Sequence, residues 1–424
     1  MLSSLRIQNY KSLHDVNLDL PAFVTVVGAN AAGKSNFADA IEFLAILARS
    51  GLAAALNEKG GYENICFRRQ RRSKGAIVLR CALSGIKEGR STFDFTMSLS
   101  FRAQKEAIRS GYLVESEHLV VAIKTDSRSE PYLEINRRKS DVKVQVNKEH
   151  RSMGLLPSAE FFEGIFERMK GKALLREDDL LLWTYLRGLP PFDRILGEMS
   201  RFRVFQLSPT EARKAGATSG SQELGKHGDN LPAVLDWLKR EQPLGFDRLL
   251  NYARQAVPTI DAIETDYTDT REMGLYLRER GIQRRLFASE LSDGTVRTLA
   301  MFLPLIDPRV RLAVIEEPEN SIHPWVVREF VEACRLCSAN KQIILTTHSP
   351  VLVSKLEPHE LYVAERARGE TAILQATRAN VELEQVIRKG IQDLGSYWDS
   401  GAMQAVPGDP QGLLEFMDSD GKGR

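Results

Sequence analysis

The first part of the chain shows the hydrophobic patterns of β-strands. Apolar and polar residues alternate at 5–7 and 16–20, as they do in a strand with one face buried and the other in water. Residues 23–27 are apolar apart from one threonine, which predicts a strand covered on both faces. Apolar residues then recur at helical spacing from about residue 35 to 49, so a helix is expected after that strand.

The middle of the chain predicts strands first and helices afterwards. Strict alternation at 92–99 is typical of a sheet with one wet face, and strands with turns are expected from about 76 to 150. Helices are expected at 157–200, 231–238 and 246–256, with a Gly-, Ser- and Lys-rich loop at 214–228. In the last third the pattern returns to α/β order, with a strand at 312–315, a helix at 325–338 and a strand at 342–346.

The strands near both ends are expected to share one sheet, with the middle of the chain inserted as a lobe. No Pro-, Gly- or Ser-rich linker separates the ends from the middle, so independent domains are not favoured. The interpretation gives two halves of one head domain at 1–85 and 285–380, an inserted lobe of strands and then helices at 86–284, and a C-terminal helical tail at 381–424.

Composition narrows the class of protein without indicating a partner. The 424 residues are 43% hydrophobic and 27% charged, an ordinary balance for a globular core. The formal net charge of +2 does not indicate a nucleic-acid-binding chain. Four cysteines are too few for a disulfide framework and favour a reducing compartment, and Cys334 and Cys337 are expected to pack in a helix. With no apolar leader and no run of about 18 apolar residues, we expect a cytoplasmic protein without a membrane partner.

The clearest motif follows the first buried strand. Residues 28–35 read Gly-Ala-Asn-Ala-Ala-Gly-Lys-Ser and match the pattern GxxxxGK[ST], between a strand and a helix as the motif requires. The glycines let backbone N–H groups surround a phosphate, Lys34 would reach the β- and γ-phosphates, and the Ser35 hydroxyl would ligate Mg²⁺. A glycine-rich turn that matches by chance is the alternative. The candidate ATP contacts in this segment are Gly28, Asn30, Gly33, Lys34, Ser35 and Asn36.

A carboxylate pair follows the strand at 312–315. Glu316 would hold Mg²⁺ together with Ser35, and Glu317 would polarise the attacking water. Two acids at a strand end can also form a solvated turn. The phosphate-binding motif in the same chain favours the catalytic interpretation.

Two further motifs accompany the phosphate loop and the carboxylate pair. Leu291-Ser292-Asp293-Gly294 opens an apolar helical run, and its Ser and Gly place N–H donors at a helix start. Thr346-Thr347-His348-Ser349-Pro350 follows a strand. Lys34 and Glu316 are 282 positions apart (316 − 34). The whole resembles ABC/SMC/RecF-like ATPases, which tolerate large insertions between these motifs.

The resemblance implies an α/β fold of the ABC-type ATPase head, with a mixed sheet, N-terminal antiparallel strands and a large inserted lobe of strands and helices. It implies that Ser292 and Gly294 contact ATP bound by a second subunit, and that His348 is a catalytic switch residue. The expected assembly is a homodimer with shared ATP sites, with a larger oligomer left open.

Finer features resemble the OLD-like branch. Residues 319–324 read Glu-Asn-Ser-Ile-His-Pro, similar to the D-loop of RecF-like and OLD-like ATPases, and residues 5–13 resemble the family's opening strand. The family commonly has Asp where Glu316 stands, and Gln70 is only a weak match for the Q-loop glutamine. The basic segments at 68–74 and 137–139 could contact DNA phosphates, but solvated turns are the simpler explanation.

The output of the ATPase has three candidate interpretations. Residues 394–402 resemble the tails of stand-alone ATPases that act beside a separate small TOPRIM-like protein, and the stretch after the histidine strand is too short for a TOPRIM domain. The first hypothesis is therefore the ATPase component of an OLD-like antiviral defence system with a separate TOPRIM-like nuclease. The alternatives are a RecF-like DNA-repair clamp that binds DNA itself, and a regulatory ATPase that gates an unrelated partner.

Overall fold

The structure is a computed structural model. It describes residues 1–67, 75–89, 91–104, 111–124, 129–139, 141–147, 161–162, 164–165, 180, 185–216, 223–380, 383, 387, 389, 393–401 and 403. The basic segment at 68–74 with Gln70, most of the helical region expected at 157–200, and most of the tail expected at 381–424 lie outside these residues.

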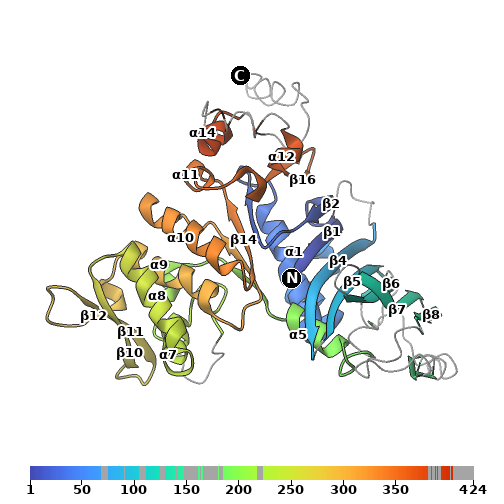
Figure 1. Cartoon of the computed structure of the whole chain (residues 1–424), viewed down its shortest axis with the longest axis horizontal. Helices are drawn as coiled ribbons and strands as arrows, with labels where there is room; N and C mark the ends of the chain where they lie inside the picture. The colour runs from blue at the N-terminus through green and yellow to red at the C-terminus, as the bar shows by residue number, and fades with distance from the viewer. Residues whose placement is uncertain are drawn as a thin grey trace.

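A six-stranded sheet forms the centre of the molecule (Figure 1), in the order β16-β15-β3-β14-β13-β9. Its strands are Phe23–Val27 (β3), Phe202–Phe205 (β9), Leu312–Glu316 (β13), Gln342–Thr347 (β14), Leu361–Ala367 (β15) and Glu370–Gln375 (β16). All are parallel except β16, which pairs antiparallel with β15. Because β3 lies between β14 and β15, the two ends of the chain share one sheet, as the hydrophobic pattern predicts.

The central strands are buried on both faces, which explains their nearly continuous apolar sequences. Alternate residues of β3 face different cores: Val24 and Val26 pack with helix α1, whereas Phe23 and Val27 pack with helices α9 and α10. These helices are Lys34–Glu58 (α1), Asp293–Ile306 (α9) and Pro324–Cys337 (α10). Cys334 is buried in α10 and all four cysteines are free.

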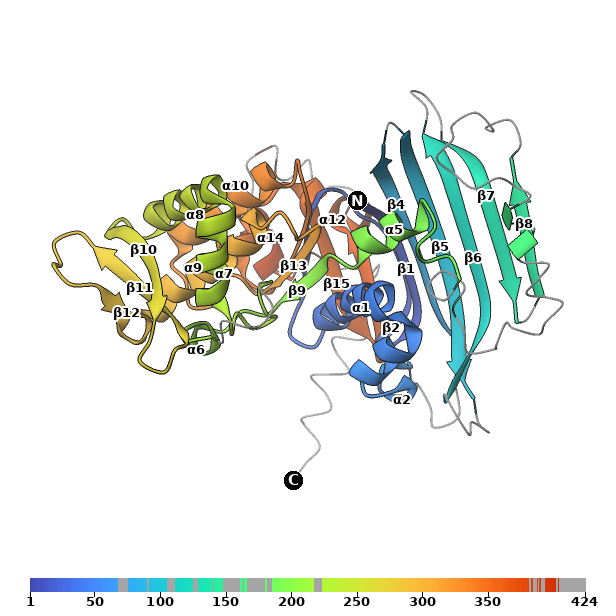
Figure 2. The ribbon, with the colours of Figure 1, turned by 90° about the horizontal axis from the view of Figure 1, so that it is seen from below.

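A second, antiparallel sheet lies beyond α1 (Figure 2), in the order β2-β1-β4-β5-β6-β7-β8. Its strands are Leu2–Tyr10 (β1), Leu13–Asp19 (β2), Ile77–Glu88 (β4), Ser91–Ala103 (β5), Tyr112–Lys124 (β6), Ser129–Arg138 (β7) and Asp141–Val146 (β8). Burial alternates along β5, as predicted for one wet face. Helix α1 packs in the core that joins the two sheets, and it continues past the expected end at residue 49 with a kink at Gly51, whose φ is 84°.

Helices and a small sheet form a lobe on the other side of the central sheet (Figures 1 and 2). The helices expected at 231–238 and 246–256 are confirmed as Leu231–Glu241 (α7) and Pro243–Ala256 (α8). The three-stranded sheet β10-β11-β12 was not expected from the sequence. Its strands are Ile260–Tyr267 (β10), Met273–Glu279 (β11) and Leu286–Phe287 (β12).

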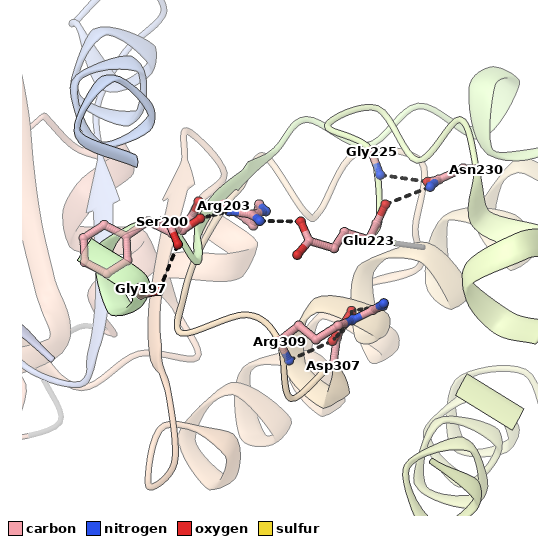
Figure 3. A network of polar contacts seen from close by, with 9 residues as sticks. Gly197, Ser200, Arg203, Glu223, Gly225, Asn230, Asp307 and Arg309 are labelled. Atoms are coloured by element: carbon pink, nitrogen blue, oxygen red, sulfur yellow. Dashed lines mark hydrogen bonds and ion pairs between the residues drawn. The ribbon is translucent and has the colours of Figure 1, made fainter. Parts of the chain in front are cut away.

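The segment before α7 is fastened to strand β9 by a polar network (Figure 3). Arg203 of β9 pairs with Glu223, and the Asn230 side chain donates to the Glu223 carbonyl at 2.7 Å and accepts from the Gly225 N–H at 2.8 Å. Lys226 of the same segment reaches Glu42 on α1 at 2.8 Å. These contacts tie the helical lobe to both the central sheet and α1.

Shorter elements complete the fold: Tyr62–Ile65 (α2), Phe192–Met199 (α5), Pro209–Ala212 (α6), Ala288–Glu290 (η2), Pro350–Val353 (α11), Pro358–Glu360 (η3), Ala376–Ala379 (α12) and Leu394–Asp399 (α14). Strand β9 lies inside the span expected as an inserted lobe, yet it forms an edge of the central sheet. The expected domain boundaries remain predictions. Among the described helices, none combines the length and apolar content needed to cross a membrane.

Candidate nucleotide site

The predicted site residues meet at one edge of the central sheet. Strands β3, β14 and β13 are parallel neighbours, with Val27 opposite Thr347 and Glu316 opposite Thr346. Their carboxyl ends therefore lie side by side. The Ser35 hydroxyl donates to Glu316 Oε2 at 2.6 Å, across 281 positions of sequence.

The glycines of the 28–35 loop are required by its close packing. Gly33 has φ 102°, and a Cβ at this position would lie 2.2 Å from Thr371 Oγ1. At Gly28 a Cβ would lie 2.4 Å from the carbonyl oxygen of Ala364 on β15. Any larger residue would displace the loop, so these positions favour glycine for steric reasons as well as for phosphate access.

Lys34 is almost fully buried at the start of α1. Its Nζ donates to the carbonyl oxygens of Gly28 at 2.6 Å and Ala29 at 3.0 Å. Burial lowers the pKa of Lys34, and three nearby carboxylates act in the opposite direction. Neutral carbonyls are modest partners for a buried ammonium, so an anionic group in the loop would be a stronger one.

Glu317 is held in an unusual backbone conformation. Its φ is 46°, in the left-handed region that a non-glycine residue seldom adopts. Its carboxylate accepts from Asn320 Nδ2 at 2.8 Å and lies 3.3 Å from His348 Nδ1. Strained backbone of this kind is concentrated at functional sites, where surrounding contacts hold a side chain in one orientation. The structure therefore brings Glu317 and His348 together.

Glu319 is close enough to interact electrostatically with both Glu317 and His348. Its Oε1 accepts a hydrogen bond from the Thr347 hydroxyl at 2.5 Å. Burial raises the pKa of Glu319. The hydroxyl of Thr347 also accepts from the Ser349 N–H at 2.9 Å. Thr347 thus ties the loop after β13 to the loop that carries His348.

Arg297 is a site residue to which the sequence assigned no role. It is 7% exposed, and its guanidinium donates to the backbone oxygens of Glu317 and Leu207, both at 2.7 Å. Burial lowers the pKa of this guanidinium. The only signal in the sequence is its place on the first turns of the helix that follows Leu291-Ser292-Asp293-Gly294. Arg297 connects that helix to the backbone of Glu317.

The other residues predicted to contact the nucleotide have different surroundings. Ser292 caps α9 by accepting from the Thr295 N–H at 3.1 Å, and a Cβ at Gly294 would lie 3.0 Å from the Ser321 carbonyl. In the part of the chain that the structure describes, neither Ser292 nor Gly294 forms a hydrogen bond with the 28–35 loop. Asn36 donates to the Ser12 hydroxyl at 2.7 Å, and Asn30 is exposed on the loop.

The oxygen ligands present suit Mg²⁺ bound together with phosphate. A hydroxyl and a carboxylate, 2.6 Å apart, are the ligands this ion prefers. No cluster of three or more His, Cys, Asp or Glu residues that could hold a metal exists among the described residues. Mg²⁺ in nucleotide sites uses one or two protein ligands and completes its shell with phosphates and water, so the pair Ser35 and Glu316 fits.

Comparisons with known proteins agree with this geometry. The model "AAA ATPase domain" matches residues 1–153, and the model "AAA domain, putative AbiEii toxin, Type IV TA system" matches residues 200–354. No curated protein matches the sequence.

Several solved structures are similar at low identity. An Smc head bound to the C-winged helix domain of ScpA has a TM-score of 0.47 and 12% identity, covering 88% of this chain and 97% of the other. The SMC head domain from Thermotoga maritima has a TM-score of 0.42 and 13% identity, covering 88% and 98%. The Smc head domain with an extended coiled coil from Pyrococcus furiosus, bound to the C-terminal domain of ScpA, has 0.45 and 13%, covering 91% and 99%.

The two ATPase models match the two segments that carry the phosphate loop and the carboxylate pair. The structure joins those segments in one mixed α/β sheet at one site. The chain therefore resembles AAA-type ATPase domains over both of the segments that meet at this site.

Proposed function

We propose that the protein binds ATP with Mg²⁺ and hydrolyses it to ADP and phosphate at a site completed by a second copy of the chain. The observation that carries the proposal is the meeting of Ser35, Glu316 and the Glu317–His348 pair at one sheet edge. Phosphate, metal and water each have a candidate partner there.

Each residue has a role that follows from its place. Lys34 exchanges its carbonyl partners for phosphate oxygens, with the backbone N–H groups at the start of α1 beside it. Ser35 and Glu316 hold Mg²⁺, which neutralises phosphate charge. Glu317 orients the attacking water and accepts its proton, and His348 donates to the γ-phosphate oxygens.

The second copy supplies the groups that this chain holds apart from its own phosphate loop. Ser292 and Gly294 stand at the start of α9, where unpaired N–H groups and the helix dipole favour an anion. They bind the γ-phosphate of ATP in the partner, so hydrolysis requires a homodimer. Two such sites per dimer follow from two-fold symmetry.

The test compares three variants by light scattering and phosphate release. Glu317→Gln with ATP accumulates as a dimer and releases phosphate at least about 100-fold more slowly, because water is no longer activated. Lys34→Ala binds no ATP and stays monomeric. Glu332→Gln, at an exposed acid on α10, behaves as wild type. A Glu317→Gln protein that binds ATP as a strict monomer would refute the shared site, and ATP binding by Lys34→Ala would refute the phosphate loop.

The biological role we propose is the ATPase component of an OLD-like antiviral defence system acting with a separate TOPRIM-like nuclease. The model matching 200–354 is named for a toxin of a type IV toxin–antitoxin system, which supports a conflict system over a transport role. A pull-down with tagged Glu317→Gln protein from its host, with and without nuclease treatment, tests it. If a small protein with a TOPRIM-like acidic site stays bound after nuclease treatment, the proposal is supported. If only DNA is recovered, a RecF-like clamp is favoured instead.

A further inference from the structure

A cavity of about 400 Å³ lies at the edge of the central sheet opposite the nucleotide site. Phe202, Arg311 and Gln342 line it, and they stand at or next to the amino ends of β9, β13 and β14. Glu316 and His348 lie at the carboxyl ends of β13 and β14. At about 3.3 Å per residue, the length of a strand, roughly 15 Å, separates the cavity from the nucleotide site.

The walls of the cavity come from three parts of the fold. Strand β4 of the antiparallel sheet contributes Ile86 and Lys87, and helix α5 contributes Arg194 and Glu198. The segment 338–341, between α10 and β14, closes a third side. Helix α5 lies between the antiparallel sheet and β9 (Figure 2). A ligand in this cavity would therefore contact both sheets.

Basic side chains outnumber acidic ones around the cavity. Lys87, Arg194, Arg311 and Lys341 line it, and Glu198 is the one acidic side chain among the described residues of its wall. Arg194 Nη2 lies 3.1 Å from Glu198 Oε1, and Arg311 Nε lies 3.1 Å from Glu198 Oε2. Two guanidiniums thus share a single carboxylate. An excess of positive charge remains, which favours an anion.

The pair with Glu198 does not satisfy the two arginines. Their Nε atoms are buried, and neither forms a hydrogen bond with a described residue. The Arg194 and Arg311 side chains are nevertheless 39% and 37% exposed, so part of each is open to a ligand. A guanidinium has five N–H donors, and a phosphate group offers three strong acceptor oxygens where a carboxylate offers two. A phosphate can therefore satisfy more of these donors than Glu198 does.

The rest of the cavity wall includes apolar side chains. Leu2, Leu83, Ile86 and Phe202 line it, and all four belong to the core that joins the two sheets. Gln342 is fixed beside them, because its Nε2 donates to the Leu2 carbonyl at 2.8 Å and its Oε1 accepts from the Leu2 N–H at 2.9 Å. The volume of about 400 Å³ is larger than a phosphate group needs and falls in the range of sites for small organic ligands. The shape and lining therefore suit an anion with an apolar part.

We propose that this cavity binds a small organic phosphate, with its phosphate group at Arg194 and Arg311 and its organic part against the apolar side chains. The planar donor arrangement of arginine matches phosphate oxygens, and each such hydrogen bond is strengthened by charge. Glu198 competes with the ligand for the same two guanidiniums. The site is separate from the proposed ATP site and does not require it. Its ligand would contact the beginnings of the strands whose far ends lead to Glu316 and His348.

The experiment measures binding of phenyl phosphate by isothermal calorimetry, with inorganic phosphate and phenol as its two halves. Phenyl phosphate binds the wild type and Lys34→Ala equally, because the cavity is far from the phosphate loop, and it binds more tightly than either half. Arg194→Met weakens binding about tenfold, since the ligand loses a charged donor. Arg240→Met removes an arginine with the same i,i+4 pairing, to Asp236 on α7, and serves as the matched control with unchanged affinity.

Glu198→Gln keeps the test independent of folding. This change removes the competing charge, so phenyl phosphate binds roughly three- to tenfold more tightly, and a damaged fold does not produce such a gain. No binding, binding lost in Lys34→Ala, or affinity unchanged in both Arg194→Met and Glu198→Gln overturns the proposal. Succinate bound as tightly as phenyl phosphate assigns the cavity to carboxylates and overturns it as well. None of these measurements uses ATP, so their failure leaves the proposed ATPase standing, and failure of the ATPase leaves this site standing.

Discussion

Replacing Arg297 by methionine tests whether the helix that follows residues 291–294 positions Glu317, the proposed catalytic carboxylate. The methionine chain fills similar volume but donates no hydrogen bond, so the backbone oxygens of Glu317 and Leu207 both lose a charged donor. Hydrogen bonds from a charged group contribute about 1.5–3 kcal/mol each. The Glu317 oxygen keeps a second donor, the Asn320 N–H at 3.2 Å, and the variant no longer buries a guanidinium. We therefore expect a net loss of about 2–4 kcal/mol in the free energy of unfolding.

Urea unfolding without nucleotide measures the change in the free energy of unfolding, and steady-state ATP hydrolysis measures the changes in kcat and KM. Since Arg297 positions the Glu317 backbone, the kcat of Arg297→Met falls about 10- to 100-fold while KM changes much less. Arg240→Met, at an exposed arginine paired with Asp236 on α7, is the control and changes stability by less than about 1 kcal/mol. A destabilised variant with wild-type kcat would show that Arg297 is structural only. Unchanged stability and unchanged kcat together would refute the reasoning.

Three further outcomes can be tested on the same protein. Gly33→Ala places a Cβ 2.2 Å from Thr371 Oγ1 at a positive φ, so we expect the free energy of unfolding, measured in urea, to fall by roughly 1–3 kcal/mol. A double-mutant cycle with Thr371→Ala should show coupling between the two positions, and strictly additive effects would argue against the clash. Ser35→Ala and Glu316→Gln each raise the Mg²⁺ concentration for half-maximal ATP hydrolysis roughly tenfold, and an unchanged requirement would remove them as ligands. Burial lowers the pKa of Lys341 to about 8, below its unfolded value of 10.5, so the charged form is disfavoured in the folded state and the unfolded state binds more protons between these values. Stability of the wild type relative to Lys341→Met should therefore rise with pH from about 8 to 10.5, and a flat difference in urea midpoints would contradict this.

The sequence predicted the elements that carry chemistry because their signals are local. A buried strand followed by GxxxxGK[ST] fixes both the conformation and the place of Lys34 and Ser35. The strand ending at Glu316 is equally short, apolar and bounded. The two strands β13 and β14 and helix α10 were expected within one or two residues of their observed bounds.

Features that depend on contacts between distant segments were not predictable in the same way. Strand β10 buries Ile260 and Ile263, three positions apart, so it lacks a period of two and is defined by its pairing with β11. Strand β9 has only four residues, and its place at the sheet edge comes from pairing with β13. Arg297 gains its role from two backbone oxygens, one of them 90 positions away. In each case the pairing partner is distant in sequence, and no local pattern of residues indicates it.

The order of strands explains why a long middle section can be inserted without disturbing the site. Hydrogen bonds between β3, β14 and β13 determine which loops meet, and these bonds do not depend on the length of chain that joins the strands. Strand β3 is flanked on one side by β14, which leads to His348, and on the other by β15, whose Ala364 packs against Gly28 of the phosphate loop. Two strands from the last third of the chain therefore flank the strand that carries the phosphate loop. The strands that lead to Glu316 and His348 are therefore held beside the phosphate loop by the sheet itself, whatever the length of the inserted section.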